Sequence, residues 1–120
     1  MGKDVVRIKL RETGKPDPPS DLFVVNVTHN AVSLSWKAGF NGGFQQQFRV
    51  RFKKKTSEEY TYSDFIAGNA SGAIINGLNP QTDYVFEIMS RNVVGESDYS
   101  EEVAYIKTLG KIIDNYNTPR

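Results

Sequence analysis

The chain has 120 residues, of which 38% are hydrophobic and 12% aromatic, and this composition fits one folded domain with short extensions. Its net charge of +1 gives no field that favours nucleic acid or an anionic membrane surface. Because the chain contains no cysteine, thiol catalysis, a zinc–thiolate site and a disulfide framework are excluded.

Residues 1–15 are predicted to form an extension that precedes the main domain. Residues 6–11 alternate apolar and basic side chains, which indicates a β-strand. Residues 14–19 contain a glycine and three prolines, a composition typical of a linker between domains. Two interpretations stay open: residues 1–13 are the last strand of a neighbouring domain, or they are an unstructured terminus. An orphaned strand would be expected to add to a sheet edge of its own domain or of a second chain.

Seven short segments of strand-like sequence follow, at residues 22–27, 31–36, 48–54, 60–66, 73–76, 84–91 and 102–108. Turn-forming stretches separate them, including the glycine-rich segments 39–43 and 68–72. No stretch shows the 3.6-residue apolar period of a helix. The pattern predicts an all-β domain over residues 16–109, a seven-stranded antiparallel β-sandwich, with residues 110–120 as a C-terminal linker.

Two aromatic residues are predicted to anchor the core between the sheets. Trp36 ends a strand in which Val32, Leu34 and Trp36 share one face. Tyr84 follows a corner at residues 78–83, and its hydroxyl is expected to bond the backbone near Leu78 as a tyrosine corner. The predicted core consists of large apolar side chains: Leu22, Val32, Leu34, Trp36, Val50, Leu78, Tyr84, Phe86 and Ile88.

No catalytic, cofactor-binding or metal-binding residues are predicted. His29 is the only histidine, and no nucleophile or orienting group lies near it in the sequence. The glycine-rich segment 39–43 lacks the following helix and the Lys-Ser/Thr pair that phosphate binding requires, which favours a tight turn. We therefore expect a protein that is not an enzyme and needs no cofactor.

Two sequons are candidate sites of N-glycosylation: Asn26-Val27-Thr28 and Asn69-Ala70-Ser71. Asn69 lies in a predicted turn and is the better candidate, whereas Asn26 lies near the end of a predicted strand. If either sequon is used, the domain is extracellular.

A basic stripe follows the third predicted strand. Arg49, Arg51 and Lys53 share one outward face at two-residue spacing, and Lys54 and Lys55 continue it. The functional interpretation is a face for an anionic partner, such as a sulfated glycan or an acidic protein patch. A solvated strand face that keeps the sheet soluble explains the same pattern, and we favour it.

Several motifs across residues 16–109 resemble a fibronectin type III domain. They are Pro18-Pro19-Ser20, Val32-x-Leu34-x-Trp36, Phe48-x-Val50-x-Phe52, Gly77-Leu78-x-Pro80-x-Thr82-x-Tyr84, and Asn92-x-x-Gly95 followed by Ser97. The resemblance implies two sheets with strand orders A-B-E and C′-C-F-G. In an immunoglobulin domain the tryptophan lies one strand later and packs on a disulfide, which makes that alternative weaker here.

Residues 36–48 resemble more narrowly the fibronectin type III module of nephrin-like and Echinoid-like immunoglobulin-superfamily adhesion receptors. The shared features are Trp36, a Gly-aromatic-x-Gly-Gly turn and the following Gln46, with Asn41 where the family usually has Asp. Residues 13–19 are similar to the exit from an immunoglobulin domain into such a module, so residues 1–13 would be the remnant of that domain.

This resemblance implies a non-catalytic module in the extracellular part of a plasma-membrane protein. The module would act as a spacer and a protein-contact surface. Homophilic or heterophilic protein partners would be reached through the whole receptor, without nucleic acid. Since no apolar run approaches the ~20 residues of a membrane span, membrane attachment would come from a segment outside this sequence. The alternatives are an intracellular structural module of a muscle or cytoskeletal array and a glycan-binding module that uses the basic stripe.

Overall fold

The computed structural model describes residues 11–111. All elements of regular secondary structure in that range are β-strands. The predicted N-terminal strand lies, except for Arg11, outside the described residues, as do residues 112–120. The strands are β1 Ser20–Val27, β2 Val32–Lys37, β3 Gln47–Lys54, β4 Thr61–Tyr62, β5 Ile66–Ala67, β6 Gly72–Ile75, β7 Asp83–Arg91 and β8 Ala104–Lys107.

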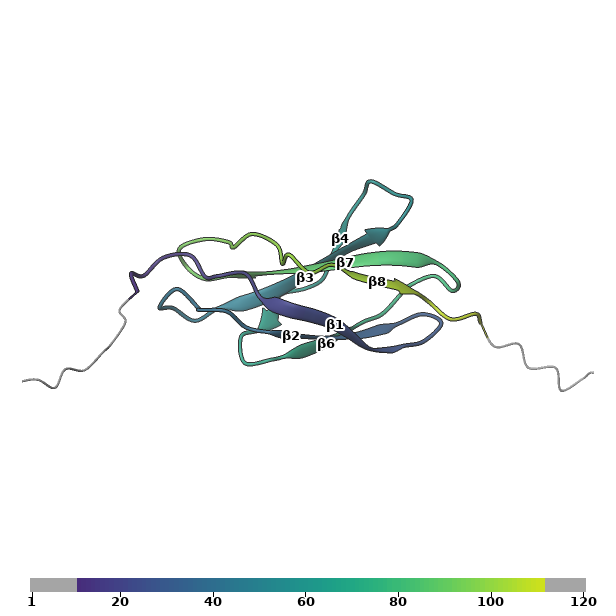
Figure 1. Cartoon of the computed structure of the whole chain (residues 1–120), viewed down its shortest axis with the longest axis horizontal. Coiled ribbons are helices and arrows are strands. Elements are labelled where there is room, and N and C mark those ends of the chain that lie inside the picture. Colours follow the sequence, from purple (N-terminus) through teal and green to yellow (C-terminus); the bar gives the residue numbers. More distant parts are fainter. Residues whose placement is uncertain (1–10, 112–120) are drawn as a thin grey trace, which may run out of the picture.

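The strands form two antiparallel sheets that pack face to face (Figure 1). One sheet has the order β1-β2-β6, and the other has the order β4-β3-β7-β8, with β5 also paired to β3. With β1 as strand A and β4 with β5 as strand C′, these are the orders A-B-E and C′-C-F-G. The predicted all-β sandwich is therefore confirmed, including the arrangement of its sheets.

The prediction of one continuous strand over residues 60–66 is wrong. Tyr62 pairs with Arg51 and Ile66 pairs with Phe48, so the segment between them has one residue too many for a continuous ladder. Ser63 bonds to Val50 at this irregularity. Its backbone N–H donates to the Val50 carbonyl at 2.8 Å, and its hydroxyl oxygen accepts the Val50 N–H at 3.0 Å. The segment is therefore two short strands, β4 and β5, joined by a bulge.

The core lies between the sheets, and it contains the residues that the alternating pattern predicted to face inward. Trp36 is 4% exposed, and its ring meets Phe48 edge-on with centroids 5.5 Å apart. The other buried members of the core are Leu22, Val32, Leu34, Phe48, Val50, Ile75, Leu78, Tyr84, Phe86, Ile88 and Ala104. Burial of these side chains is the main favourable contribution to folding in a domain without disulfides.

The tyrosine corner joins Tyr84 at the start of β7 to the segment that precedes it. The Tyr84 ring is buried, and its hydroxyl oxygen accepts the backbone N–H of Asn79 at 2.8 Å. The predicted bond to the backbone near Leu78 is thus present, and its backbone partner is the N–H of Asn79. The bond holds the β6–β7 connection against the end of the second sheet.

Among residues 11–111, no helix is long and apolar enough to cross a membrane. The same residues include no group of three or more His, Asp or Glu side chains that could hold a metal ion.

Candidate functional site

The basic stripe lies on the outer face of the β4-β3-β7-β8 sheet. Arg49, Arg51 and Lys53 of β3 lie directly opposite Met89, Glu87 and Val85 of β7. Directly opposite residues of an antiparallel pair point to the same side of the sheet, so these six side chains form one layer. Val85 and Met89 are buried, which means that the basic side chains lie across an apolar floor.

Arg51 lies between two tyrosine rings that come from outside β3. Its guanidinium carbon is 4.1 Å from the Tyr60 ring centroid and 3.8 Å from that of Tyr99. Lys53 approaches the Tyr60 ring as well, at 5.3 Å. A cation over an aromatic face is attracted by the ring quadrupole, by about 0.5–2 kcal/mol per contact.

Arg51 also forms an ion pair with Glu87, with Nε and Oε1 2.8 Å apart, and the Tyr60 hydroxyl donates to the same carboxylate oxygen at 3.3 Å. Burial alone would lower the pKa of Arg51, but the hydrogen bond and charge of Glu87 outweigh it, and the pKa is raised. Burial raises the pKa of Tyr60, and the Glu87 charge adds to this. Burial likewise raises the pKa of Tyr99. The cluster is therefore an arginine–carboxylate pair with two neutral tyrosines.

Arg49 and Arg91 share the ring of Phe65, a residue of the bulge between β4 and β5. Their guanidinium carbons are 4.1 Å and 3.2 Å from its centroid. Arg49 also lies 5.6 Å from the Tyr62 ring and donates from Nε to the Ser63 carbonyl at 2.9 Å. Each arginine of this face is thus held by rings and by hydrogen bonds.

The structure divides the five predicted basic residues into two groups. Arg49, Arg51 and Lys53 are half-buried and lie against aromatic rings, whereas Lys54 and Lys55 are exposed at the end of β3. Tyr62 and Tyr105 stand at the edges of the face with 49% and 67% of their surface exposed. Arginine with tyrosine is the composition that protein–protein contacts favour, and it differs from a row of lysines that attracts an anion.

A second feature is the contact between the N-terminal linker and the glycine-rich turn. The Gly14 N–H donates to the Gly42 carbonyl at 3.0 Å. The Asn92 side-chain amide donates to the Gly14 carbonyl at 2.7 Å and to the Asn41 carbonyl at 2.9 Å. Gly42 has φ 77°, and a Cβ there would overlap the Gly14 carbonyl oxygen. We call this group, Gly14, Asn41, Gly42 and Asn92, the linker clamp.

Further contacts hold the linker beyond the linker clamp. The Asp17 N–H donates to the Phe40 carbonyl at 2.8 Å, and the Ser90 hydroxyl donates to the Asp17 carbonyl at 2.7 Å. Arg11 pairs with the Asp17 carboxylate at 3.0 Å and lies 4.2 Å from the Phe40 ring centroid. The proline-containing segment that was predicted to be a linker between domains is therefore bound along one end of the sandwich.

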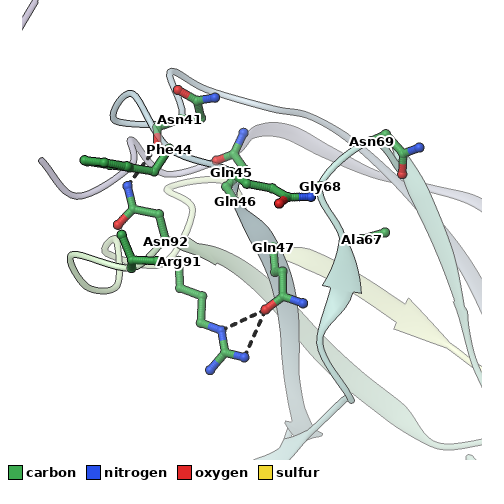
Figure 2. Close-up of a pocket in the computed structure, with 11 residues that line it drawn as sticks. Asn41, Phe44, Gln45, Gln46, Gln47, Ala67, Gly68, Asn69, Arg91 and Asn92 are labelled. Atoms are coloured by element: carbon green, nitrogen blue, oxygen red, sulfur yellow. Dashed lines mark hydrogen bonds between the residues drawn. The ribbon is translucent and has the colours of Figure 1, made fainter. Parts of the chain in front are cut away.

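An open hollow of about 1020 Å³ lies beside the linker clamp, between the glycine-rich turn, the β5–β6 turn and the β7–β8 hairpin (Figure 2). Amide side chains line most of it, and Arg91 donates to the Gln47 side-chain oxygen at 3.0 and 3.1 Å. No lining residue carries a carboxylate, an imidazole or a hydroxyl, so the hollow offers hydrogen bonds without a general base or nucleophile.

Both sequon asparagines are exposed. Asn69 lies in the turn between β5 and β6, at the rim of the hollow. Asn26 lies on β1, where strict alternation from the buried Leu22 would turn it into the core. A bulge prevents this, because Val24 pairs with Leu34 and Asn26 pairs with Ser33, which leaves Val25 as an extra residue. Asn26 therefore points away from the core.

Sequence reasoning missed the aromatic partners of the arginines and the linker clamp. Tyr60-x-Tyr62 has the spacing of two residues on one strand face and was a usable signal beside the basic stripe. Asn92 was visible only as part of the family pattern. Its partner Gly14 is 78 positions away, and no local pattern links them.

Two antiparallel sheets in these orders, with a buried tryptophan on the second strand and no disulfide, define an immunoglobulin-like β-sandwich module. Residues 17–105 match the family model of the fibronectin type III domain, and the chain belongs to this family. The resemblance of the motifs is thereby confirmed. Domains of this family are generally non-catalytic.

Curated relatives extend the likeness to nephrin. Mouse nephrin is 34% identical over 102 residues, which are 85% of this chain and 8% of that protein. Human Ephrin type-A receptor 6 is 35% identical over 78% of this chain and 9% of the receptor. Chicken Protein sidekick-1 is 32% identical over 92% of this chain and 5% of its own length. The chain thus spans less than a tenth of each of these relatives.

Solved structures show the same fold. The chicken CNTN1 FN1-FN3 domains superpose with a TM-score of 0.74 at 27% identity, covering 81% of this chain and 34% of that one. A three-domain segment of titin superposes with a TM-score of 0.71 at 25% identity, covering 78% of this chain and 32% of that one.

Proposed function

We propose that this chain is a non-catalytic extracellular module of a cell-surface adhesion receptor, in which it acts as an in-line spacer. The observation that carries the proposal is the attachment of the two ends of the described chain at opposite ends of the sandwich (Figure 1). The linker clamp holds the N-terminal segment at one end. At the other end, the Leu109 N–H donates to the Thr28 carbonyl and its own carbonyl accepts the Gln81 N–H, both at 3.1 Å.

A spacer must transmit position and direction, and a bound linker does this better than a free one. A free glycine- and proline-containing segment samples many directions. Here the backbone of Gly14 and Asp17 is hydrogen-bonded to the sandwich, so the direction of the chain at residue 13 follows the sandwich. A preceding domain would then keep a defined angle to this module.

The extracellular setting is supported by two exposed sequons and by relatives that include a receptor by name. An intracellular structural array is the rival setting, and the likeness to titin favours that candidate. The arginine and tyrosine face of β3 and β7 supplies a surface of the composition that protein contacts use.

Labelling of intact cells tests the setting. Cells that make the full-length gene product are stained with an antibody against this module, before and after permeabilisation. We expect the intact cells to be labelled. Labelling that appears only after permeabilisation would place the module inside the cell and refute the receptor assignment.

The spacer role has a separate test in small-angle scattering of the full-length ectodomain. Asn92→Asp removes the donors of the linker clamp, and we expect a broader distribution of end-to-end distances. Asn76→Asp, an exposed position elsewhere, makes the same change of charge as a control. Identical scattering curves for the wild type and Asn92→Asp would show that the linker clamp does not set the angle.

A further inference from the structure

The outer face of the β1-β2-β6 sheet exposes three large apolar side chains. Phe23, Val25 and Ile74 are 54%, 61% and 64% exposed. Phe23 lies opposite Ser35, and Ile74 lies opposite Ser33, so only small serines separate the apolar groups across β2. Single exposed apolar residues are common, but several on one sheet face indicate that something covers them.

Asn26 lies within this group. It pairs with Ser33, which pairs in turn with Ile74, so Asn26, Ser33 and Ile74 form one row across the sheet. The bulge at Val25 turns both Val25 and Asn26 outward and lets Val27 return to the core. The sequon asparagine, which a regular strand would bury, is thus presented on the apolar face, next to Val25 and in one row with Ile74.

We propose that Asn26 carries an N-linked glycan whose first N-acetylglucosamine residues lie on Phe23, Val25 and Ile74 and cover this face. The proposal rests on the extracellular setting proposed above. The Asn26 amide nitrogen would bond to C1 of N-acetylglucosamine from a lipid-pyrophosphate-linked oligosaccharide. The bond from C1 to the pyrophosphate oxygen breaks, and the lipid pyrophosphate and an amide proton leave.

The chemistry of the two surfaces is complementary. A pyranose ring presents C–H groups on one face, and these pack against an aromatic ring and branched aliphatic groups while the sugar hydroxyls remain in water. Phe23 precedes Asn26 on the same strand and on the same outer side, because Phe23 and Asn26 oppose Ser35 and Ser33 of β2. The glycan would therefore reach its apolar contacts without any change in the sheet.

A second protein chain is a less suitable cover. A stable protein interface needs about 20–30 residues a side, whereas the apolar part of this face has three residues. A glycan attached at Asn26 needs a contact area only as large as its first sugar rings. Its covalent attachment also removes the entropic cost of association.

The test uses the complete 120-residue chain, secreted from cells that add high-mannose glycans. Mass spectrometry of glycopeptides measures the occupancy of Asn26 and Asn69 in one sample, and we expect Asn26 to be occupied. Trimming with an endoglycosidase then leaves a single N-acetylglucosamine. We expect the trimmed chain to melt about 2–4 °C above the Asn26→Gln variant.

Phe23→Ser should abolish that difference, because it removes the ring under the sugar. Val93→Ser is the matched control: Val93 is 84% exposed in the β7–β8 hairpin, and its loss should leave the difference unchanged. Equal melting temperatures for the trimmed chain and Asn26→Gln, or a difference that survives Phe23→Ser, would overturn the proposed packing.

The occupancy result separates this proposal from the extracellular setting. Occupied Asn69 with unoccupied Asn26 would overturn the glycan cover and leave the setting intact, because surface labelling tests the setting independently. If Asn26 is unoccupied and the chain forms a dimer that Phe23→Ser dissociates, the cover is a second copy and the proposal is wrong.

Discussion

Substitution of Asn92 by Asp offers a selective test of the linker clamp, because the two side chains have the same shape. The Asn92 carbonyl oxygen accepts the N–H groups of Val94 and Gly95 at 2.8 and 3.2 Å, and Asp keeps both bonds. The two bonds donated to Gly14 and Asn41 are lost. The hairpin loop therefore survives while the linker is released.

The magnitude follows from the bond to Gly14, because Asn41 belongs to the glycine-rich turn and stays with the sandwich when the linker leaves. That bond is worth about 1 kcal/mol net, so undocking of the linker should become easier by about 1 kcal/mol. Since the linker can leave without unfolding the sandwich, the change appears as local opening. The Gly14 N–H, which donates to Gly42, should exchange with solvent about fivefold faster, since each 1.4 kcal/mol is tenfold.

Amide hydrogen exchange read by NMR measures this rate residue by residue. Amides in the middle of β7 serve as an internal reference, and Asn76→Asp controls for the added negative charge. Unchanged exchange of the Gly14 N–H in Asn92→Asp would refute the conclusion that these side-chain bonds hold the linker. An equal acceleration at Gly14 and throughout β7 would also refute it, because the effect would then be global.

Three further predictions concern the tyrosine corner, the tyrosine–arginine face and the exposed lysines. Tyr84→Phe should lower the free energy of unfolding by about 1 kcal/mol, because the Asn79 N–H loses its partner; Tyr105→Phe, whose side chain is 67% exposed, should not change the melting temperature. The raised pKa values of Tyr60 and Tyr99 favour their neutral forms in the folded state, so their contribution is complete below pH 10.0 and is lost as pH rises through the folded pKa values. Replacing both by Phe should flatten the decline of stability above pH 10.0 in chemical denaturation, and a decline as steep as that of the wild type would contradict this. Finally, Lys54→Ser with Lys55→Ser should change elution from heparin no more than Lys107→Ser with Lys111→Ser, a matched exposed pair; a larger change would indicate a specific anion site at the end of β3.

Local sequence patterns were sufficient for the sandwich itself. Alternation over residues 32–36 and 48–52 identifies the buried faces of two strands, because the side chains of a strand point alternately to either side. The corner before Tyr84 and the turns between strands have recognisable residue types. These features depend on neighbours in the chain, which is why the fold, its core and its family were predictable from the sequence.

The positions of the bulges, where the alternation of side chains along a strand is interrupted, are determined by the partner strand. The bulge at Val25 exists because Leu34 and Ser33 of β2 fix which residues of β1 lie opposite them. The break between β4 and β5 likewise depends on the ladder of β3. A one-residue shift of register reverses every side chain beyond it, so the exposure of Asn26 could not be deduced from β1 alone.

The amino-acid sequence alone therefore determined the two-layered architecture, its family and the identity of the inward-facing residues, since those follow from periodicity and turn chemistry. Tertiary structure decided which groups meet at the surface. It placed Arg51 between Tyr60 and Tyr99, opposite the Glu87 carboxylate, which is 36 positions away in the sequence. It also joined Gly14 to Asn92, which are 78 positions apart. Such contacts depend on how strands from distant segments are brought together in space, and no pattern within either segment encodes them.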